Sequence, residues 1–342
     1  MSLIANLYPV LKPWLFRMDA EQAHEWTTRL MRISHSLGLL TAGMEKLPQT
    51  PVDCLGLRFP NVLGLAAGMD KSASAVEAWG ALGFGFVEVG TLTPRPQPGN
   101  PKPRLFRLPE HDALINRMGF NNPGIQAAVK RLKNRRTQAV VGVNIGKNFD
   151  TPNEDAVNDY LLGLKEAYPV ADYIAVNISS PNTKGLRDLQ AEESIRALLA
   201  ALKKEQARLA KESGLLKPVL VKIAPDLDGQ QIEALARVFN ELAVDGVIAT
   251  NTTINREAVA GHPLEKEAGG LSGAPVKERS TQVIQAFRML LKDGTPIIGV
   301  GGILSGADAQ EKLSAGAQLV QVYSGLVFRG PALVQDIIRK VG

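Results

Sequence analysis

Beyond residue 60, short apolar runs alternate along the chain with longer amphipathic stretches. Eight runs rich in Val and Ile predict strands at residues 62–67, 85–89, 139–145, 173–178, 219–224, 246–250, 296–300 and 319–323. Most of these runs are continuously apolar, which is typical of parallel strands buried on both faces beneath helices. Apolar positions with helical spacing follow the strands at about residues 72–82, 123–135, 153–167, 191–212, 229–243, 277–292, 305–315 and 331–341. Eight strand–helix units predict an α/β fold, a closed (β/α)8 TIM barrel rather than an open doubly wound sheet.

Residues 1–47 differ from this alternation. Helical spacing relates two sets of apolar residues there: Leu3, Leu7, Val10, Leu11 and Trp14, then Ala23, Trp26, Leu30, Ile33 and Leu37. We predict two short amphipathic helices, separated near residues 13–19, as a small extension of a barrel that occupies residues 48–342. Their apolar faces either cover the flank of the barrel or enter a membrane interface, and the pattern alone does not decide between them.

Polar or Gly-rich clusters follow nearly every predicted strand. They comprise residues 66–71, Thr91, Asn144, residues 177–180, Lys222, and residues 250–252, 301–302 and 323–324. Because the carboxyl ends of barrel strands meet at one mouth, the clusters predict a functional site there. A Pro-rich excursion at residues 91–121 and a second one at 252–276 interrupt the alternation, and connections this long are usually functional.

The last two of these clusters predict a site that binds a phosphate group. Gly301 and Gly302 follow the seventh predicted strand and Gly325 follows the eighth, where bare backbone amides of such barrels bind phosphate. Lys71 and Lys222, at other strand ends, each need an anion if they point into a barrel mouth.

The other polar residues suit a planar heterocycle such as a flavin or a pyrimidine, because amides offer paired donors and acceptors without charge. These residues are Asn144, Asn177, Asn182 and Asn251. The histidines lie outside the strand-end clusters and are expected at the surface: His24, His35, His111 and His262. The remaining proton acceptor is the hydroxyl of Ser179 or Ser180, which needs activation by its surroundings.

Composition narrows the class of protein. The 342 residues, 45% of them hydrophobic, fit one barrel with an appendage and a sizeable core. The single cysteine, Cys54, excludes an internal disulfide, and no metal site is predicted because no metal-ligand spacing occurs. No run approaches the ~18–20 apolar residues of a membrane-spanning helix, and no signal peptide is evident. The net charge of +5 is compatible with anionic small molecules, lipid or RNA and selects none of them.

The clusters resemble the dihydroorotate dehydrogenases, and specifically their membrane-associated, quinone-dependent class 2. The matching motifs, in family order, are AAGMDK (66–71), NRMGFNN (116–122), VNIGKN (143–148), NISSPNT (177–183), KIAPD (222–226), TNTT (250–253), GGLSG (269–273), GVGGI (299–303) and YSG (323–325). They span most of residues 60–330, and the predicted helix pair extends the resemblance to the whole chain. Ser180 stands where soluble class 1 relatives carry a cysteine, which favours class 2.

The resemblance implies an FMN-containing barrel that oxidises (S)-dihydroorotate to orotate in de novo pyrimidine synthesis and passes the electrons to a membrane quinone. The implied FMN contacts are Ala67, Gly68, Met69, Asp70, Lys71, Thr91, Asn144, Asn177, Lys222, Thr250, Gly273, Gly302, Tyr323 and Ser324. The implied orotate contacts are Lys71, Asn116, Arg117, Met118, Gly119, Phe120, Asn177, Asn182, Asn251 and Thr252. Ser180 is implied as the catalytic base that takes a proton from C5 while hydride leaves C6. His24, Arg107 and Tyr323 match residues near the inner end of a quinone tunnel formed by the N-terminal helices.

Two other functions stay open. A dihydrouridine synthase acting on tRNA would need a cysteine acid and a basic RNA-binding appendage, and neither is evident. A non-catalytic phosphate- or membrane-binding barrel would leave the combination of Lys71, Asn177, Ser180 and Lys222 unexplained. We therefore expect a monomeric enzyme that binds dihydroorotate, orotate and quinone but no nucleic acid. Its N-terminal helices are expected to attach it peripherally to the cytoplasmic face of the inner membrane.

Overall fold

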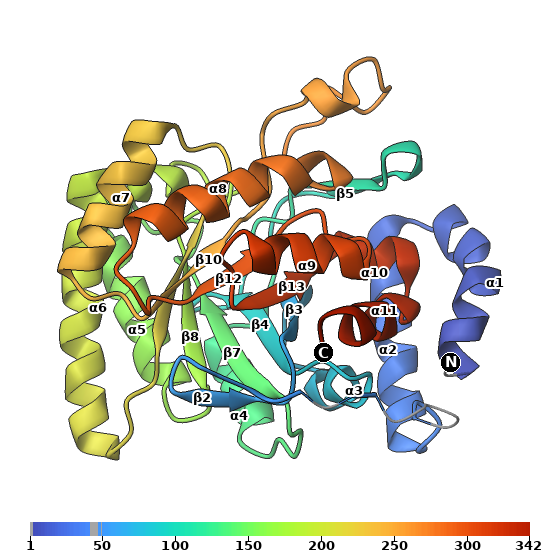
Figure 1. The fold of residues 1–342 in the computed structure, drawn as a ribbon, viewed down its shortest axis with the longest axis horizontal. Coiled ribbons are helices and arrows are strands. Elements are labelled where there is room, and N and C mark those ends of the chain that lie inside the picture. Colours follow the sequence, from blue (N-terminus) through green and yellow to red (C-terminus); the bar gives the residue numbers. More distant parts are fainter. Residues whose placement is uncertain (1–2, 42–46, 49) are drawn as a thin grey trace.

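The eight predicted strands form a closed barrel at the centre of the molecule (Figure 1). The computed structural model describes residues 3–41, 47–48 and 50–342. The barrel strands are β3 (Leu63–Asp70), β4 (Phe86–Leu92), β7 (Val140–Ile145), β8 (Tyr173–Asn177), β9 (Val219–Ile223), β10 (Gly246–Ala249), β12 (Ile297–Val300) and β13 (Leu319–Val322). Each strand pairs in parallel with the next in this order, and β13 closes the ring on β3. The predicted (β/α)8 barrel is confirmed.

Helices surround the barrel where the periodicity predicts them. They are α3 (Val76–Ala81), α4 (Ile125–Leu132), α5 (Ala156–Ala167), α6 (Glu192–Ser213), α7 (Gly229–Glu241), α8 (Lys277–Leu290), α9 (Gly306–Ser314) and α11 (Ala332–Val341). Local sequence sets their ends: α7 begins where Asp228 and Gln231 exchange reciprocal side chain to backbone hydrogen bonds. A further short helix, α10 (Ser324–Arg329), lies between β13 and α11 and is not among the helices that the apolar spacing predicts.

The two long excursions meet in a small antiparallel sheet. The first supplies β5 (Leu105–Leu108) and β6 (Ala113–Asn116), and the second supplies β11 (Gly270–Gly273). The order is β5-β6-β11, so residues more than 150 positions apart in the sequence become neighbours. A separate hairpin of β1 (Val52–Cys54) and β2 (Leu57–Phe59) places Phe59 edge-on against Phe86 of the barrel, with ring centroids 5.3 Å apart.

Apolar side chains pack against both faces of the barrel strands. Side chains such as Phe86, Leu220 and Ile298 fill the barrel, and a larger layer separates the strands from the helices. Every residue of β4, β7, β8 and β9 is buried, which explains why these segments read as continuous apolar runs. This packing on both faces fixes the positions of the strand ends relative to one another.

The N-terminal helices are α1 (Leu3–Arg17) and α2 (Ala20–Ser36), and α2 packs against α3 and β5 (Figure 1). α1 runs through Pro13, so the separation predicted near residues 13–19 is confined to Met18 and Asp19. Asp19 begins α2 by accepting hydrogen bonds from the N–H groups of Glu21 and Gln22 at 3.1 and 3.0 Å. Residues 42–46 and 49, on either side of the predicted division between 47 and 48, lie outside the described residues, and that division stays a prediction.

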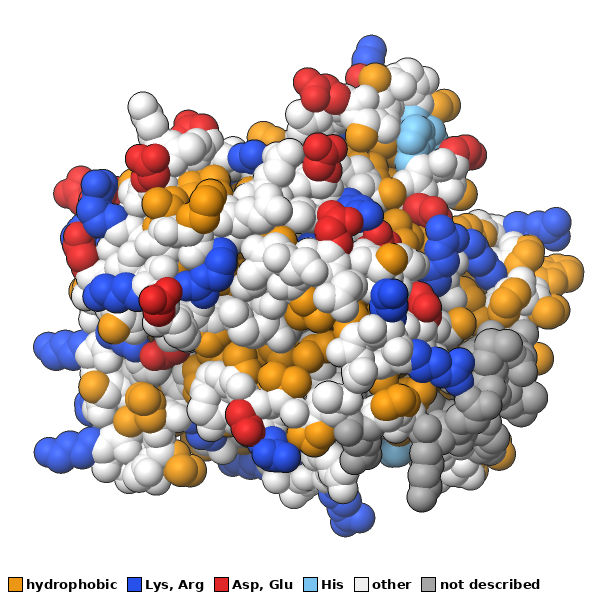
Figure 2. Space-filling view, in the orientation of Figure 1, with side chains coloured by type: hydrophobic (Ala, Val, Ile, Leu, Met, Phe, Trp, Pro, Cys, Tyr) orange, Lys and Arg blue, Asp and Glu red, His pale blue; other side chains and the backbone are white. Residues whose placement is uncertain are grey.

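Both N-terminal helices expose large apolar side chains. These are Leu7, Val10, Leu11, Trp14, Trp26, Leu30 and Ile33, and Leu37, directly after α2, is exposed as well. Figure 2 shows hydrophobic side chains gathered over α1 at the right edge of the molecule. No helix in the described part of the chain has the length and apolar character needed to span a lipid bilayer.

Candidate active site

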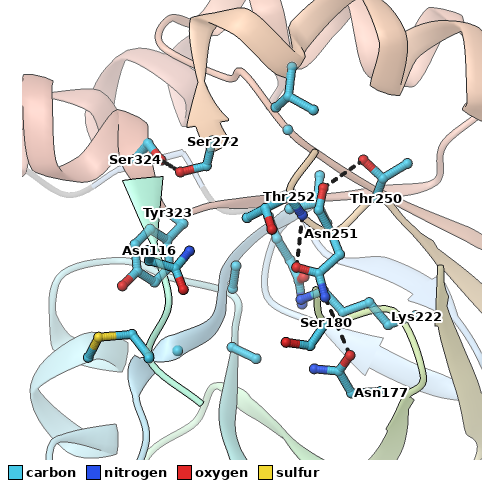
Figure 3. A pocket seen from close by; sticks show the side chains of 18 of the residues that line it. Asn116, Asn177, Ser180, Lys222, Thr250, Asn251, Thr252, Ser272, Tyr323 and Ser324 are labelled. Atoms are coloured by element: carbon cyan, nitrogen blue, oxygen red, sulfur yellow. Dashed lines mark hydrogen bonds between the residues drawn. The ribbon is translucent and has the colours of Figure 1, made fainter. Parts of the chain in front are cut away.

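A cavity lies at the mouth of the barrel, where the strands end (Figure 3). Together with its opening it encloses about 1020 Å³ that no atom fills. The predicted site residues that line it are Ala67, Gly68, Lys71, Thr91, Asn116, Met118, Gly119, Phe120, Asn177, Ser180, Asn182, Lys222, Thr250, Asn251, Thr252, Gly273, Gly302, Tyr323 and Ser324. Most of the predicted cofactor and substrate residues thus share one space.

One wall of this mouth cavity consists of hydroxyl and amide side chains that follow β8 and β10 (Figure 3). The amide oxygen of Asn177 accepts hydrogen bonds from Asn251 at 3.4 Å and from the Ser179 hydroxyl at 3.3 Å. The hydroxyl of Ser180 lies beside these groups and accepts the N–H of Asn182 at 3.2 Å. In the described residues no titratable side chain is hydrogen-bonded to Ser180, so its strength as a base depends on what the cavity holds.

Arg187, which the sequence analysis does not identify as a site residue, holds this wall together. Arg187 donates to the carbonyl of Ser179 at 3.0 Å and to that of Thr252 at 2.8 Å, and it pairs with Asp226 at 2.8 Å. The loop after β8 and the loop after β10 are thereby joined. Arg187 lies in a short 3-10 helix, Leu186–Gln190, and a single arginine there carries no sequence signal that identifies such a role.

A buried carboxylate supports the cavity from inside the barrel. Glu88 of β4 is fully buried and accepts hydrogen bonds from Asn144 at 2.8 Å and from the Tyr173 hydroxyl at 3.0 Å. Gln321 donates to the same carboxylate at 2.9 Å, and the amine of Lys222 lies 3.5 Å away. Five barrel strands meet through Glu88, which fixes Lys222 at the cavity. The sequence does carry a signal here, since Glu88 is an acidic residue within a continuously apolar strand.

The opposite wall is made of backbone and small side chains. Gly301 and Gly302 follow β12, and the hydroxyls of Ser272 and Ser324 lie 2.8 Å apart (Figure 3). A Cβ on Gly302 would lie 2.3 Å from the Cβ of Lys277, and its φ of +70° is left-handed, so only glycine fits. Bare amides beside two hydroxyls offer the donors that a phosphate group needs.

Lys71 reaches the cavity from the end of β3. Burial lowers the pKa of Lys71 to about 8, and no carboxylate in the described residues forms an ion pair with its amine. An anion in the cavity would compensate for this lost hydration.

Three buried polar atoms on the cavity wall have no hydrogen-bond partner among the described residues. They are the side-chain oxygens of Asn182, Thr252 and Gln321. An unsatisfied buried acceptor or hydroxyl costs free energy, so these atoms favour a ligand that brings hydrogen-bond donors of its own. This donor requirement fits a heterocycle with amide edges and disfavours an apolar occupant.

A second cavity lies between the N-terminal helices and the barrel. It and its opening enclose about 1810 Å³, and apolar residues of α1 and α2 such as Leu11, Leu15 and Met31 line much of it. Tyr323 lines this helix cavity and the mouth cavity, which makes it a shared wall. Burial raises the pKa of Tyr323 to about 12, so its hydroxyl stays protonated.

The other two residues of the predicted quinone site also line the helix cavity. Arg107 donates to the carbonyls of Phe16 at 2.9 Å and Met18 at 3.2 Å, which ties β5 to the end of α1. Burial lowers the pKa of His24 to about 3, so the imidazole is neutral at physiological pH. The expected surface position of His24 is therefore wrong, because its side chain turns toward the barrel. That of His262 is wrong too, since only 15% of its side chain is exposed and its Nδ1 accepts the Leu264 N–H at 3.0 Å.

Four predicted residues lie outside the lining of the mouth cavity. Asp70 caps the next turn by accepting the N–H groups of Ser74 and Ala75, each at 2.8 Å. Met69 lines the helix cavity, and Asn144 lies one layer deeper, where it accepts the Thr91 hydroxyl at 2.6 Å.

Arg117 turns away from the mouth cavity. It pairs with Glu267 and lies over the ring of Phe106, 4.6 Å from the centroid.

In the described part of the chain no group of three His, Cys, Asp or Glu side chains is arranged to hold a metal ion.

Comparisons with known proteins agree with this geometry. The family model described as dihydroorotate dehydrogenase matches residues 50–342. A protein of Chromobacterium violaceum named dihydroorotate dehydrogenase (quinone) is 57% identical over 333 residues, covering 97% of each chain. One of the same name from Stenotrophomonas maltophilia is 56% identical over 341 residues, covering 98% of this chain and 96% of the other. A crystal structure of DHODH from Eimeria tenella in complex with ferulenol superposes with a TM-score of 0.84 at 38% identity, covering 94% of this chain and 90% of that one. Matched along nearly its whole length by relatives of that name, the chain belongs to the dihydroorotate dehydrogenase family, in its quinone-dependent class.

Proposed function

We propose that the chain is an FMN-dependent enzyme that oxidises (S)-dihydroorotate to orotate and passes the electrons to a membrane quinone, in de novo pyrimidine synthesis. The observation that carries the proposal is the pair of cavities on either side of Tyr323. One carries a base candidate, two lysines and several amide side chains, and the other is lined mainly by apolar residues. A reaction with a small anionic donor and a large apolar acceptor needs both kinds of space.

The residues of the mouth cavity fit FMN. The glycine and serine wall at Gly301, Gly302 and Ser324 would hold its phosphate, and Thr91 and Lys222 would face its ring. The unsatisfied oxygens of the cavity wall favour a group with amide edges, as this ring has. When bound, FMN supplies a two-electron acceptor between the substrate and the quinone.

The remaining polar residues would bind and deprotonate dihydroorotate. Lys71 would pair with the carboxylate of the substrate, and Asn116, Asn177 and Asn251 would bind its amide edges. The hydroxyl of Ser180 would take the proton from C5, while the hydrogen on C6 would leave as hydride and carry away the two electrons of the oxidation. Lys222, held by Glu88, would supply positive charge to the neighbouring ring.

The helix cavity would take the quinone. Its apolar lining suits a quinone ring with a hydrocarbon tail, and His24, Arg107 and Tyr323 would bind the carbonyl oxygens at its inner end. The exposed apolar side chains of α1 and α2 would enter the interface of the membrane that carries the quinone. The protein would then lie peripherally on the cytoplasmic face of that membrane.

An anaerobic titration of the purified protein with dihydroorotate, followed by flavin absorbance, tests the proposal. Stoichiometric bleaching that a ubiquinone analogue reverses is the expected result. A yellow protein that dihydroorotate does not bleach would refute the substrate, and a colourless protein that cannot be loaded with FMN would refute the cofactor.

A further inference from the structure

A buried ion pair joins the N-terminal helix α2 to the loop that follows β4. The carboxylate of Glu21 accepts two hydrogen bonds from Arg104, from Nε at 3.0 Å and from Nη2 at 2.7 Å. Both side chains are almost fully buried, and Lys102 approaches the same carboxylate at 3.4 Å. Burial opposes ionisation, but Arg104 and Lys102 lower the pKa of Glu21 below its usual range, so the pair is charged at neutral pH.

The third guanidinium nitrogen of Arg104, Nη1, bonds to the backbone of the loop that precedes it in the chain. Nη1 donates to the carbonyls of Pro98 at 2.6 Å and Asn100 at 2.7 Å. Between them, Gly99 has a φ of +77°, and a Cβ there would lie 2.2 Å from the carbonyl oxygen of Met118. The loop therefore lies directly against the backbone of a residue that lines the mouth cavity.

The same loop bonds to two segments of the mouth cavity. The N–H of Asn100 donates to Met118 at 3.1 Å, and Gln97 donates to the carbonyl of Gly119 at 2.9 Å. The side-chain amide of Asn100 donates to the carbonyl of Arg117 at 2.9 Å and to that of Asn182 at 3.3 Å. Asn182 belongs to the loop that carries Ser180.

We infer that Glu21 and Arg104 are positioning residues of the substrate site, through which helix α2 holds the part of the cavity wall made by Met118, Gly119 and Asn182. A buried ion pair is weak evidence for stability, because desolvation offsets the attraction, whereas its fixed bidentate geometry is well suited to setting the position of a loop. Helix α2 thus belongs to the substrate site as well as to the helix cavity. The inference rests on the proposed function, since orotate is the ligand whose site is positioned.

Glu21→Gln removes the charge and keeps the size of the side chain. We expect its dissociation constant for orotate, measured by perturbation of the flavin spectrum, to rise about tenfold, and the KM for dihydroorotate to rise with it. FMN affinity and the rate of flavin reduction at saturating dihydroorotate are expected to stay within about twofold of wild type. Reduction at saturation that falls as much as affinity would overturn a purely positioning role.

Glu25→Gln is the matched control on the same helix. Glu25 is exposed, and like Glu21 it acts on Lys71 through charge, without bonding to the loop. If Glu25→Gln weakens orotate binding as much as Glu21→Gln does, the effect is long-range electrostatics and the inference is wrong.

Asn100→Ala provides a second route if Glu21→Gln does not fold. It removes both side-chain bonds from the loop to the cavity wall and leaves the ion pair in place, so it should reproduce the loss of orotate affinity. Wild-type protein that binds FMN but no orotate would defeat the proposed function. Wild-type protein that binds orotate, with both variants binding it equally well, would defeat only the positioning role.

Discussion

The mouth of the barrel and the N-terminal helix pair present two different kinds of binding surface. Much of the mouth cavity is lined by single polar side chains near strand ends, several of them held by hydrogen bonds or ion pairs to neighbours, as Lys222 is by Glu88. The helix cavity is built from apolar area, and several of the side chains around it are exposed to solvent. Because polar contacts are directional, a single substitution at the mouth can have a large effect on binding or reaction rate. Apolar contact in the helix cavity is spread over many side chains, so a single substitution there removes only a small part of it.

Under the proposed function, this difference would separate two half-reactions. Changes at the mouth should alter reduction of the flavin by dihydroorotate, and changes in the apolar lining of the helix cavity should alter its reoxidation by quinone. The largest single effects are therefore expected at the mouth, and the smallest at positions that only support it.

Ser180→Ala gives the largest expected effect. Loss of the proposed base should slow flavin reduction by dihydroorotate by about 10²–10⁴-fold, because that is the usual contribution of a positioned general base. FMN and orotate should still bind, since the serine is neutral. Stopped-flow absorbance under anaerobic conditions measures the rate.

Ser179→Ala is the control for that variant. The Ser179 hydroxyl is buried and bonds to Asn177 and Asn251 without lining the cavity, so its loss should cost far less. A reversed order of the two variants would move the base to Ser179.

Lys71→Ala comes next. Losing a charged hydrogen bond should weaken orotate binding by about 1.5–3 kcal/mol. Because the pKa of Lys71 is about 8 in the free protein, wild-type affinity for the orotate carboxylate should fall as pH rises through 8, when the amine loses its charge. The variant should lack this dependence, and titrations from pH 6.5 to 9.5 measure it. Equal affinity of the two proteins for orotate at pH 7 would remove Lys71 from the substrate site.

These mouth residues could be predicted from the sequence because strand ends are visible in it. A continuous apolar run locates a strand, and a polar residue near or just after its carboxyl end, such as Lys222 in β9 or Asn251 after β10, is then expected at the mouth. All eight barrel strands and most of the cavity lining follow from this rule.

Contacts between distant segments could not be predicted in the same way. The sheet of β5, β6 and β11 and the pairing of Glu21 with Arg104 join segments that no local pattern relates. The helix cavity is equally hidden, since amphipathic spacing in residues 1–37 predicts helices without showing whether they enclose a space. Arg117 is an example of the opposite error. Its place in the NRMGFNN motif predicts a contact with the substrate, but its side chain pairs with Glu267 outside the mouth cavity.

Deletion of residues 1–15 separates the two surfaces. It removes most of α1 from the helix cavity but leaves Glu21 and the carbonyls of Phe16 and Met18 that Arg107 binds. Turnover with a ubiquinone analogue should fall about tenfold, as expected from losing roughly 1.5 kcal/mol of apolar contact. Bleaching by dihydroorotate and affinity for orotate should both be unchanged, whereas Glu21→Gln should weaken orotate binding. Unaltered quinone kinetics in the shortened protein would contradict the assignment of the helix cavity.

The smallest effect is expected behind the mouth, at Lys312 of α9. Its fully buried amine donates to the Lys277 carbonyl and to the Thr281 hydroxyl of α8, each at 2.6 Å, and Lys277 lies against Gly302. Burial lowers the pKa of Lys312 from 10.5 to about 7, so between these values the unfolded chain binds the proton more tightly than the folded one. Its contribution to the free energy of unfolding should therefore rise with pH above 7, by at most roughly 1.4 kcal/mol per pH unit. Lys312→Met should flatten this slope in urea unfolding at pH 7, 8 and 9, while activity at pH 7 changes little. Parallel pH profiles for the two proteins would mean that the amine keeps its proton in the fold, and that the wall behind the mouth tolerates a buried charge.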